Sequence, residues 1–282
     1  MTSERLPSVG SMFRAARLLA ASSVFVVAVA GTSLAATQVA DLGDPTGVNA
    51  SDALNNPPRV QTLVQQANDA IKRGDLRVAT LLLRNALQIV PKNATIRTQL
   101  GSVLLRQGDS AGAEREVRQA RNDGAPDGSV LPILFQAMIT RDKFRDLLDQ
   151  FPEPPPNDKS DLAADILRAR AIAFQRLGQI PQANAAIDKS LAVQRTALAL
   201  LTKAQLAQNQ GNPALAASAT DEALKLDPKE PSLLIMKIGL LQSARAELGA
   251  ATPNKGGHRE KAMQLIDQAI GEIRAGIAFA GG

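Results

Sequence analysis

Histidine, cysteine and closely spaced carboxylates carry much of the catalytic and metal-binding chemistry of proteins. This chain of 282 residues has one histidine and no cysteine. His258 lies in the glycine-rich stretch GGHRE, beside Arg259 and Glu260. One histidine without cysteine makes no zinc site, and no serine or carboxylate is spaced to form a catalytic triad with it. We therefore interpret His258 as a solvated loop residue.

Other sequence signals of chemistry are also missing. The phosphate-binding pattern GxxxxGK[ST] does not occur in the chain. Asp146 and Asp149 are paired carboxylates at helical spacing, and we interpret them as surface charge. The sequence therefore predicts a protein that is not an enzyme and that has no catalytic residue, metal ion or cofactor.

The charged residues favour no polyanionic nucleic-acid partner. The formal net charge is +5, but lysine and arginine are interspersed with aspartate and glutamate. Glu114 and Arg118 stand four residues apart, a spacing typical of ion pairs on a solvated helix face. Aromatic residues make up only 2% of the chain, which leaves few side chains on which bases could stack. We predict no nucleic-acid partner.

The polar residues that remain must be positioned by helices, because small and straight-chain apolar residues dominate the chain and favour that structure. A fixed spacing of small residues recurs: a glycine, an alanine five residues later, and a second small residue seven further on. The four sets are Gly74, Ala79 and Ala86; Gly108, Ala113 and Ala120; Gly178, Ala183 and Ser190; and Gly211, Ala216 and Ala223. Repetition at about 34 residues is typical of helical arrays.

This pattern resembles the tetratricopeptide repeat, in which two antiparallel helices occupy 34 residues. Residues 94–127 match the family's pattern at seven positions: Leu100, Gly101, Leu104, Gly108, Ala113, Val117 and Ala120. The resemblance implies an all-α, right-handed solenoid of stacked helix pairs over residues 60–282. The small residues let the paired helices approach closely, the glycine makes the turn between them, and a proline ends the second helix.

Six units follow from this register. Four keep the spacing, at 60–93, 94–127, 164–196 and 197–230. A degenerate unit at 128–159 has no glycine at its turn near Arg141 and ends in the proline-rich stretch PEPPPND, which predicts an extended segment. The last unit, 231–275, is degenerate and carries an insertion at 249–258.

The first 58 residues differ from the array. Arg14 and Arg17 precede an apolar run and the exit Ser33-Leu34-Ala35, the form of a secretory signal peptide cleaved after Ala35. An uncleaved membrane anchor is the alternative. Residues 36–58 are polar and rich in turn formers, which predicts a disordered linker. We expect an exported protein of the periplasm or cell envelope.

Stacked helix pairs form a concave groove lined by the first helix of each pair. Amides and cations dominate the positions predicted to face it, and acidic residues are nearly absent. Such a surface suits an extended peptide backbone, or carboxylates on a chain or glycan, although polar residues are also ordinary at exposed helix positions. The predicted groove residues are Asn68, Lys72, Thr98, Ser102, Arg106, Arg168, Gln175, Arg176, Gln205, Gln208 and Asn209.

A narrower resemblance begins at residue 60. The first two units, followed by a drifted unit with Val130-Leu131-Pro132, are similar to long repeat proteins of bacterial exosortase (PEP-CTERM) protein-sorting systems. This implies a Gram-negative envelope protein that works beside exopolysaccharide production. The chain has no cysteine to carry the lipid that is general in those relatives.

Two functions follow from these features. The first is a non-catalytic scaffold that binds a protein of an envelope assembly. The alternative is a periplasmic array that binds an anionic polysaccharide and guides it through the groove. The last helix ends with an apolar face and no polar capping helix, so it also predicts self-association.

Overall fold

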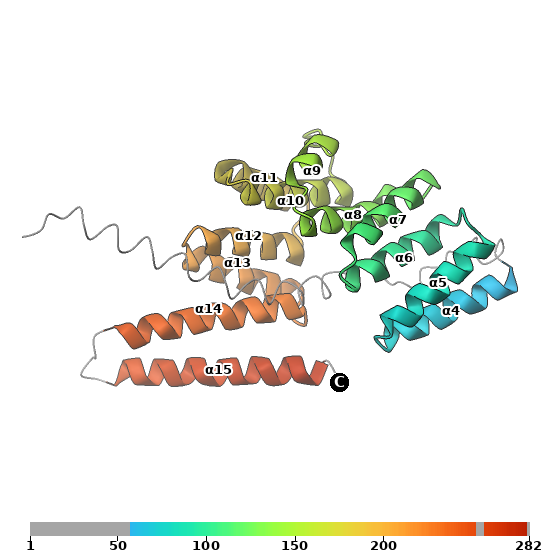
Figure 1. Ribbon diagram of the computed structural model, residues 1–282. Helices are drawn as coiled ribbons and strands as arrows, with labels where there is room; N and C mark the ends of the chain where they lie inside the picture. The colour runs from blue at the N-terminus through green and yellow to red at the C-terminus, as the bar shows by residue number, and fades with distance from the viewer. Residues whose placement is uncertain (1–56, 252–256, 281–282) are drawn as a thin grey trace, which may run out of the picture.

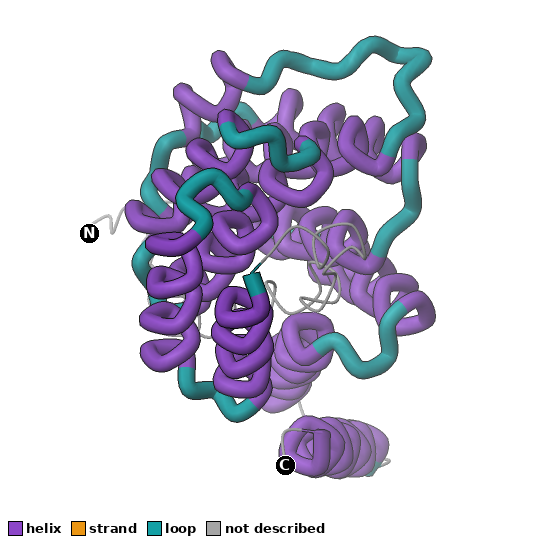
Figure 2. Tube along the Cα trace, turned by 90° about the vertical axis from the view of Figure 1, so that its right-hand side faces the viewer, coloured by secondary structure: helices purple, strands orange, loops and turns teal. Residues whose placement is uncertain are grey.

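The computed structural model describes residues 57–251 and 257–280. The predicted signal peptide, most of the predicted linker and the middle of the predicted insertion lie outside them. The described residues form helices joined by loops, with no strand among them (Figures 1 and 2). The helices are α4 (Pro58–Lys72), α5 (Leu76–Ile89), α6 (Ala94–Arg106), α7 (Ser110–Asn122), α8 (Asp127–Thr140), α9 (Phe144–Gln150), α10 (Asp161–Arg176), α11 (Ile180–Val193), α12 (Ala197–Asn209), α13 (Pro213–Leu226), α14 (Pro231–Ala250) and α15 (His258–Ala280).

Successive helices form antiparallel pairs, and each pair stacks on the next (Figure 1). The most extensive contacts join α4 to α5, α6 to α7, α10 to α11 and α12 to α13. Contacts also join the second helix of one pair to the first helix of the next, such as α5 to α6 and α7 to α8. The prediction of an all-α solenoid is therefore confirmed.

The recurring small residues lie where paired helices cross. Ala79, Ala113, Ala183 and Ala216 are all fully buried, with 0% of their surface exposed. At Gly101 a β-carbon would lie only 2.5 Å from the Cγ1 atom of Val117 on the partner helix. A larger side chain at these positions would push the helix axes apart, which explains why the sequence repeats small residues there.

The turn inside each regular pair depends on a left-handed backbone residue. Gly74 and Gly108 have φ angles of 80° and 85°, and the glycines at 178 and 211 repeat this conformation with 74° and 70°. Such angles strain residues that carry a β-carbon. In the third pair Asp142 takes this conformation instead, with a φ of 53°, and aspartate tolerates it better than most residues.

The hydrophobic core runs through several units instead of filling one. One cluster extends from Val60 on α4 to Ala173 on α10, and a second extends from Ala171 on α10 to Leu233 on α14. No single pair has enough buried apolar surface for a core of its own. The pairs therefore stabilise one another along the array.

The third pair departs from the regular pattern. Its second helix, α9, has only seven residues and is followed by the proline-rich loop. Phe151 anchors the start of this loop by packing edge to face on Phe135, with 4.8 Å between the ring centroids. Arg170 on α10 donates to the backbone oxygens of Leu148 and Phe151 at 3.1 and 2.7 Å. The loop therefore begins at a fixed position.

The last pair is longer than the others, with 20 residues in α14 and 23 in α15. Figure 1 shows these two helices side by side at the C-terminal end of the array. Ile270 is buried, whereas 58% of Leu265 remains exposed. Arg245 and Asp267 form an ion pair across the two helices at 2.5 Å.

Candidate binding surface

The predicted groove residues lie on α4, α6, α10 and α12, the first helices of their pairs. We call the side of these helices that carries them the first-helix face. Contacts between α6 and α8, α8 and α10, and α10 and α12 place these helices in a row. The first-helix face is therefore made of side chains from units far apart in the sequence.

On α6, Thr98, Ser102 and Arg106 are spaced by four residues and so share one side of the helix. All three are partly buried, and the Thr98 hydroxyl donates to the Ala94 carbonyl at 2.8 Å. Arg106 lies in the last turn of α6, and no carboxylate of the described residues lies within ion-pair distance of it. Its charge is favourable beside the carbonyl end of the helix dipole and is also available to a ligand.

On α4, Asn68 and Lys72 are likewise four residues apart. Only 5% of Asn68 is exposed, and its side-chain oxygen has no hydrogen-bond donor among the described residues. Most buried polar atoms of native proteins have a partner. Lys72 is exposed in the last turn. Asn68 is thus a buried acceptor in place of the solvated side chain expected at this position.

On α10, Gln175 and Arg176 lie two turns beyond Arg168 and on the same side of the helix. Asp165 also lies on this side, 3.6 Å from Arg168 (Oδ1 to Nη2). The expectation that acids are nearly absent from the face is therefore wrong at α10. Burial raises the pKa of the Asp165 carboxyl above its ordinary value, although the charge of Arg168 opposes the shift.

On α12, Gln205 and Asn209 are four residues apart, and Gln208 precedes Asn209. Gln205 is partly buried, whereas Gln208 and Asn209 are exposed. The third pair adds Gln136 and Thr140 on α8, which stand 34 residues after Ser102 and Arg106. We did not predict these two residues, although the repeat spacing identifies them.

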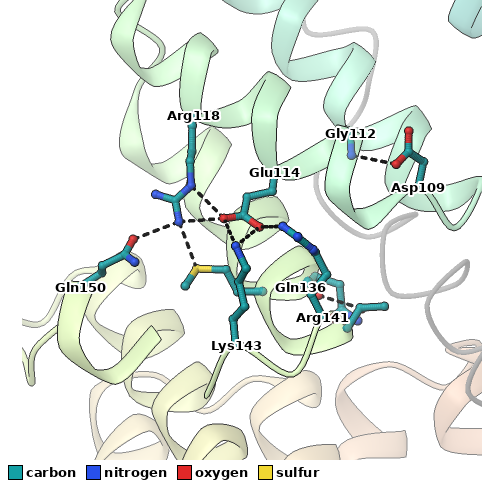
Figure 3. Close-up of polar contacts among 10 residues, drawn as sticks. Asp109, Gly112, Glu114, Arg118, Gln136, Arg141, Lys143 and Gln150 are labelled. Carbon is teal, nitrogen blue, oxygen red and sulfur yellow. Dashed lines mark hydrogen bonds and ion pairs between the residues drawn. The ribbon is translucent and has the colours of Figure 1, made fainter. Parts of the chain in front are cut away.

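Glu114 and Arg118 do not form the solvated surface pair that their spacing predicts. Glu114 is only 5% exposed and is surrounded by three cations (Figure 3). The Lys143 ammonium lies 3.0 Å from both carboxylate oxygens, Arg118 Nε lies 3.1 Å from Oε1, and Arg141 also donates to Oε2. The cluster ties α7 to the turn between α8 and α9.

Burial of the Glu114 carboxylate would by itself raise its pKa. The hydrogen bonds from Lys143, Arg118 and Arg141 outweigh that effect and hold the pKa of Glu114 below its ordinary value. Arg118 also contacts the Met138 sulfur at 3.7 Å and the Gln150 side-chain oxygen at 3.0 Å. Every contact of the cluster joins neighbouring units, so its role is structural.

The residues considered first for chemistry remain dispersed. His258 is exposed, at the first residue of α15 and not within a loop. Asp146 and Asp149 are exposed on α9. Within residues 57–251 and 257–280, no three histidine or acidic side chains are grouped to hold a metal ion, and no helix has the length and apolarity to cross a bilayer.

A pocket of about 300 Å³ lies on another side of α4 from Asn68. Gln66, Asp69 and Arg73 of α4 line it, together with Val78 and Leu82 of α5. It opens at the N-terminal pair and includes none of the predicted groove residues. The predicted surface is therefore a set of aligned side chains and does not coincide with this pocket.

Comparison with known proteins supports the repeat assignment. Two family models, both described as tetratricopeptide repeat, match residues 70–131 and 168–231. A tetratricopeptide repeat protein from Thermus thermophilus has a similar structure, with a TM-score of 0.51, 17% identity, and coverage of 65% of this chain and 99% of that one. PilF from Pseudomonas aeruginosa gives a TM-score of 0.50 at 16% identity, with coverage of 76% and 91%.

A curated relative is much longer than this chain. The cellulose synthase operon protein C of Xanthomonas axonopodis pv. citri is 28% identical over 195 residues, which make up 66% of this chain and 13% of the relative. The repeat matches, the helix pairs and the buried alanines agree with one another. This chain is a tetratricopeptide repeat protein.

Proposed function

We propose that the protein is a non-catalytic scaffold that binds a protein partner along its first-helix face. Tetratricopeptide repeats bind protein partners, and the present array offers a row of polar first helices for that purpose. The observation that carries the proposal is the set of cations without a carboxylate partner among the described residues. These are Lys72, Arg106 and Arg176, from three different units.

The proposed setting is the envelope of a Gram-negative bacterium, reached by export through the N-terminal signal. The signal lies outside the described residues, and the proposal rests on the basic, apolar and small-residue pattern of residues 1–35. The proposed system is exopolysaccharide production linked to exosortase sorting. The similarity to a cellulose synthase operon protein supports the polysaccharide part of this setting.

Capture of the partner from envelope extract tests the scaffold function. The test variant replaces Lys72, Arg106 and Arg176 with glutamine. The matched control replaces Arg77, Arg84 and Arg115, three exposed arginines on the second helices α5 and α7. Both variants lose three positive charges, so a general charge effect would appear in both.

We expect the wild type and the control to capture the same protein, and the first-helix variant to lose it. The identity and amount of the captured protein are measured by mass spectrometry. Equal capture by both variants, or loss only from the control, would contradict the proposed surface. Unchanged circular dichroism melts of both variants ensure that folding is not the cause.

The alternative function is the binding of an anionic polysaccharide, and the relative named for a cellulose synthase operon is the observation that favours it. In that case loss of Arg106, Arg168 and Arg176 abolishes retention of a purified polyuronate such as alginate. If that variant still binds the polymer but no longer captures the protein, the scaffold function holds instead.

We further propose self-association through α15, where Leu265 stays exposed at the end of the array. Replacing Leu265 with lysine should lower the sedimentation coefficient at high protein concentration to its dilute value. The same change at Val78, an exposed apolar residue of α5, serves as the control. A wild type that sediments as a monomer at all concentrations would exclude this interface.

A further inference from the structure

Arg168 on α10 has the least complete set of partners for its degree of burial. Its side chain is only 13% exposed. The Nε–H group is buried and has no acceptor among the described residues. The Nη2 atom has a loose contact, 3.6 Å from the Asp165 carboxylate, which is beyond hydrogen-bond distance. One edge of the guanidinium is therefore nearly unused.

Other arginines of this chain use the same edge fully. Arg121 binds Asp127 with Nε and Nη2, at 2.6 and 2.9 Å from the two carboxylate oxygens. Arg195 binds both oxygens of Glu222 in the same way, with 2.7 Å at Nη2. This two-point contact is the preferred geometry between arginine and a carboxylate. The edge that these residues fill is the one that Arg168 leaves open.

Asp165 does not complete the site. It precedes Arg168 by three residues on the same helix and reaches only Nη2. Burial raises the pKa of the Asp165 carboxyl, and the negative charge of Asp161 raises it further, so the charged form is poorly stabilised where it lies. An external carboxylate that meets both Nε and Nη2 would make better hydrogen bonds than Asp165 does.

We infer that Arg168 anchors a carboxylate side chain of an acidic peptide segment and that Asp165 occupies the anchor loosely until this ligand arrives. The inference rests on the proposed function of the first-helix face and specifies the chemistry of the partner. A peptide also carries backbone N–H donors, which the buried acceptor of Asn68 lacks. The cations Arg106 and Arg176 favour a ligand of negative charge on the same face.

Selection of random displayed peptides on the full chain tests this inference. The selection is repeated on Arg168→Gln, on Asp165→Asn and on Arg115→Gln, which removes an exposed charge from α7 as the control. We expect peptides selected by the wild type and by Arg115→Gln to share an aspartate or glutamate at one position. Peptides selected by Arg168→Gln should lack this preference.

A double-mutant cycle then isolates the contact. The selected peptide is synthesised with its acidic residue and with the matching amide. Against the wild type, the amide should weaken binding by about tenfold or more, as expected for a charged hydrogen-bonded pair. Against Arg168→Gln the two peptides should bind equally. Asp165→Asn should bind the acidic peptide more tightly, because the competing carboxylate is gone.

Each outcome of these experiments decides the inference. Peptides without an acidic preference, or an equal loss on amidation for the wild type and Arg168→Gln, overturn the anchor while leaving the proposed scaffold intact. A first-helix face that selects no peptide and captures no protein overturns both. Binding of alginate, dependent on Arg168 and without any peptide preference, assigns the anchor to a uronate and overturns the peptide.

Discussion

Glu114 shows how one side chain couples neighbouring units of the array. Arg141, 27 residues further along the chain, contacts it from the next turn. The same separation joins Gln107 to Thr80 at 2.9 Å, and a separation of 26 residues joins Gln210 to Asn184 at 2.9 Å. The contact between a second helix and the next turn therefore recurs, and at Glu114 it is ionic.

We expect Glu114→Gln to destabilise the protein by about 1–3 kcal/mol, since three cations lose the carboxylate they surround. Urea unfolding monitored by circular dichroism measures the change. Asp149→Asn, at an exposed position of α9, is the matched control and should have little effect. Equal stability of the two variants would show that the cluster contributes nothing.

The same substitution predicts a dependence on pH. The folded state lowers the pKa of Glu114, so its contribution to stability is present above the pKa of the unfolded chain, which is about 4.3. The contribution is lost as the pH falls through the lower, folded value. The stability difference between the wild type and Glu114→Gln should therefore be constant near neutral pH and shrink in acid. A difference that grows in acid would contradict this sign.

Spacing alone could not predict this cluster. The pair Glu114 and Arg118 is local, and local spacing indicates an exposed ion pair. Arg141 and Lys143 reach Glu114 only because the third pair stacks on α7. Their unit lacks the glycine and alanine that identify the other units, so the repeat spacing does not place their turn. Asp165 was not predicted for a simpler reason, because the predicted groove residues are amides, hydroxyls and cations.

At the scale of the helix, the turn glycines and the crossing alanines were predictable because each has a local cause. A positive φ favours glycine, and a close helix crossing requires a small side chain. The six pairs therefore follow from the sequence. The short α9 and the long α14 were not predicted in detail, since their lengths depend on packing against neighbouring pairs.

The turn glycines give a matched pair of substitutions. Gly108→Ala should destabilise the protein by about 1–2 kcal/mol, because alanine must take a left-handed conformation with a φ of 85°. Gly239→Ala, in the interior of α14 where a β-carbon meets no atom within 4 Å, should stabilise it by about 0.5–1 kcal/mol. Thermal melts measure both, and shifts in the same direction would contradict the account of the turn.

The helix crossings predict a strong effect of side-chain size. Ala113→Arg should cost at least about 1–3 kcal/mol, because the crossing with α6 has no room for the larger side chain. Ala185→Arg, at an exposed position of the second helix α11, is the control and should leave the melting temperature nearly unchanged. An unchanged melt of the Ala113 variant would mean that the pairs do not cross there.

At the scale of the whole molecule, stacking aligns residues that are far apart in the sequence. Lys72, Arg106 and Arg176 lie in or near the last turns of α4, α6 and α10, where a cation also suits the helix dipole. Their positions follow from the repeat register. Their binding role does not, because the same residues serve the helix ends whether or not a ligand is present.

The repeat architecture also makes each unit depend on its neighbours. Core clusters extend across several pairs, and polar contacts such as Lys203 to Asp188 and Lys237 to Asp221 join successive units. A partner that spans several first helices would therefore contact a surface whose parts are held in register. This is the physical basis on which the array serves as a scaffold.

Photo-crosslinking from single positions tests this claim most directly. A photoreactive amino acid is placed at Ser102 on the first-helix face of α6, and in a parallel protein at Arg115 on α7. In envelope extract we expect the probe at Ser102 to form a crosslink to one defined protein, and the probe at Arg115 to give none to it. Crosslinks to that protein from Arg115 but not from Ser102 would contradict the account.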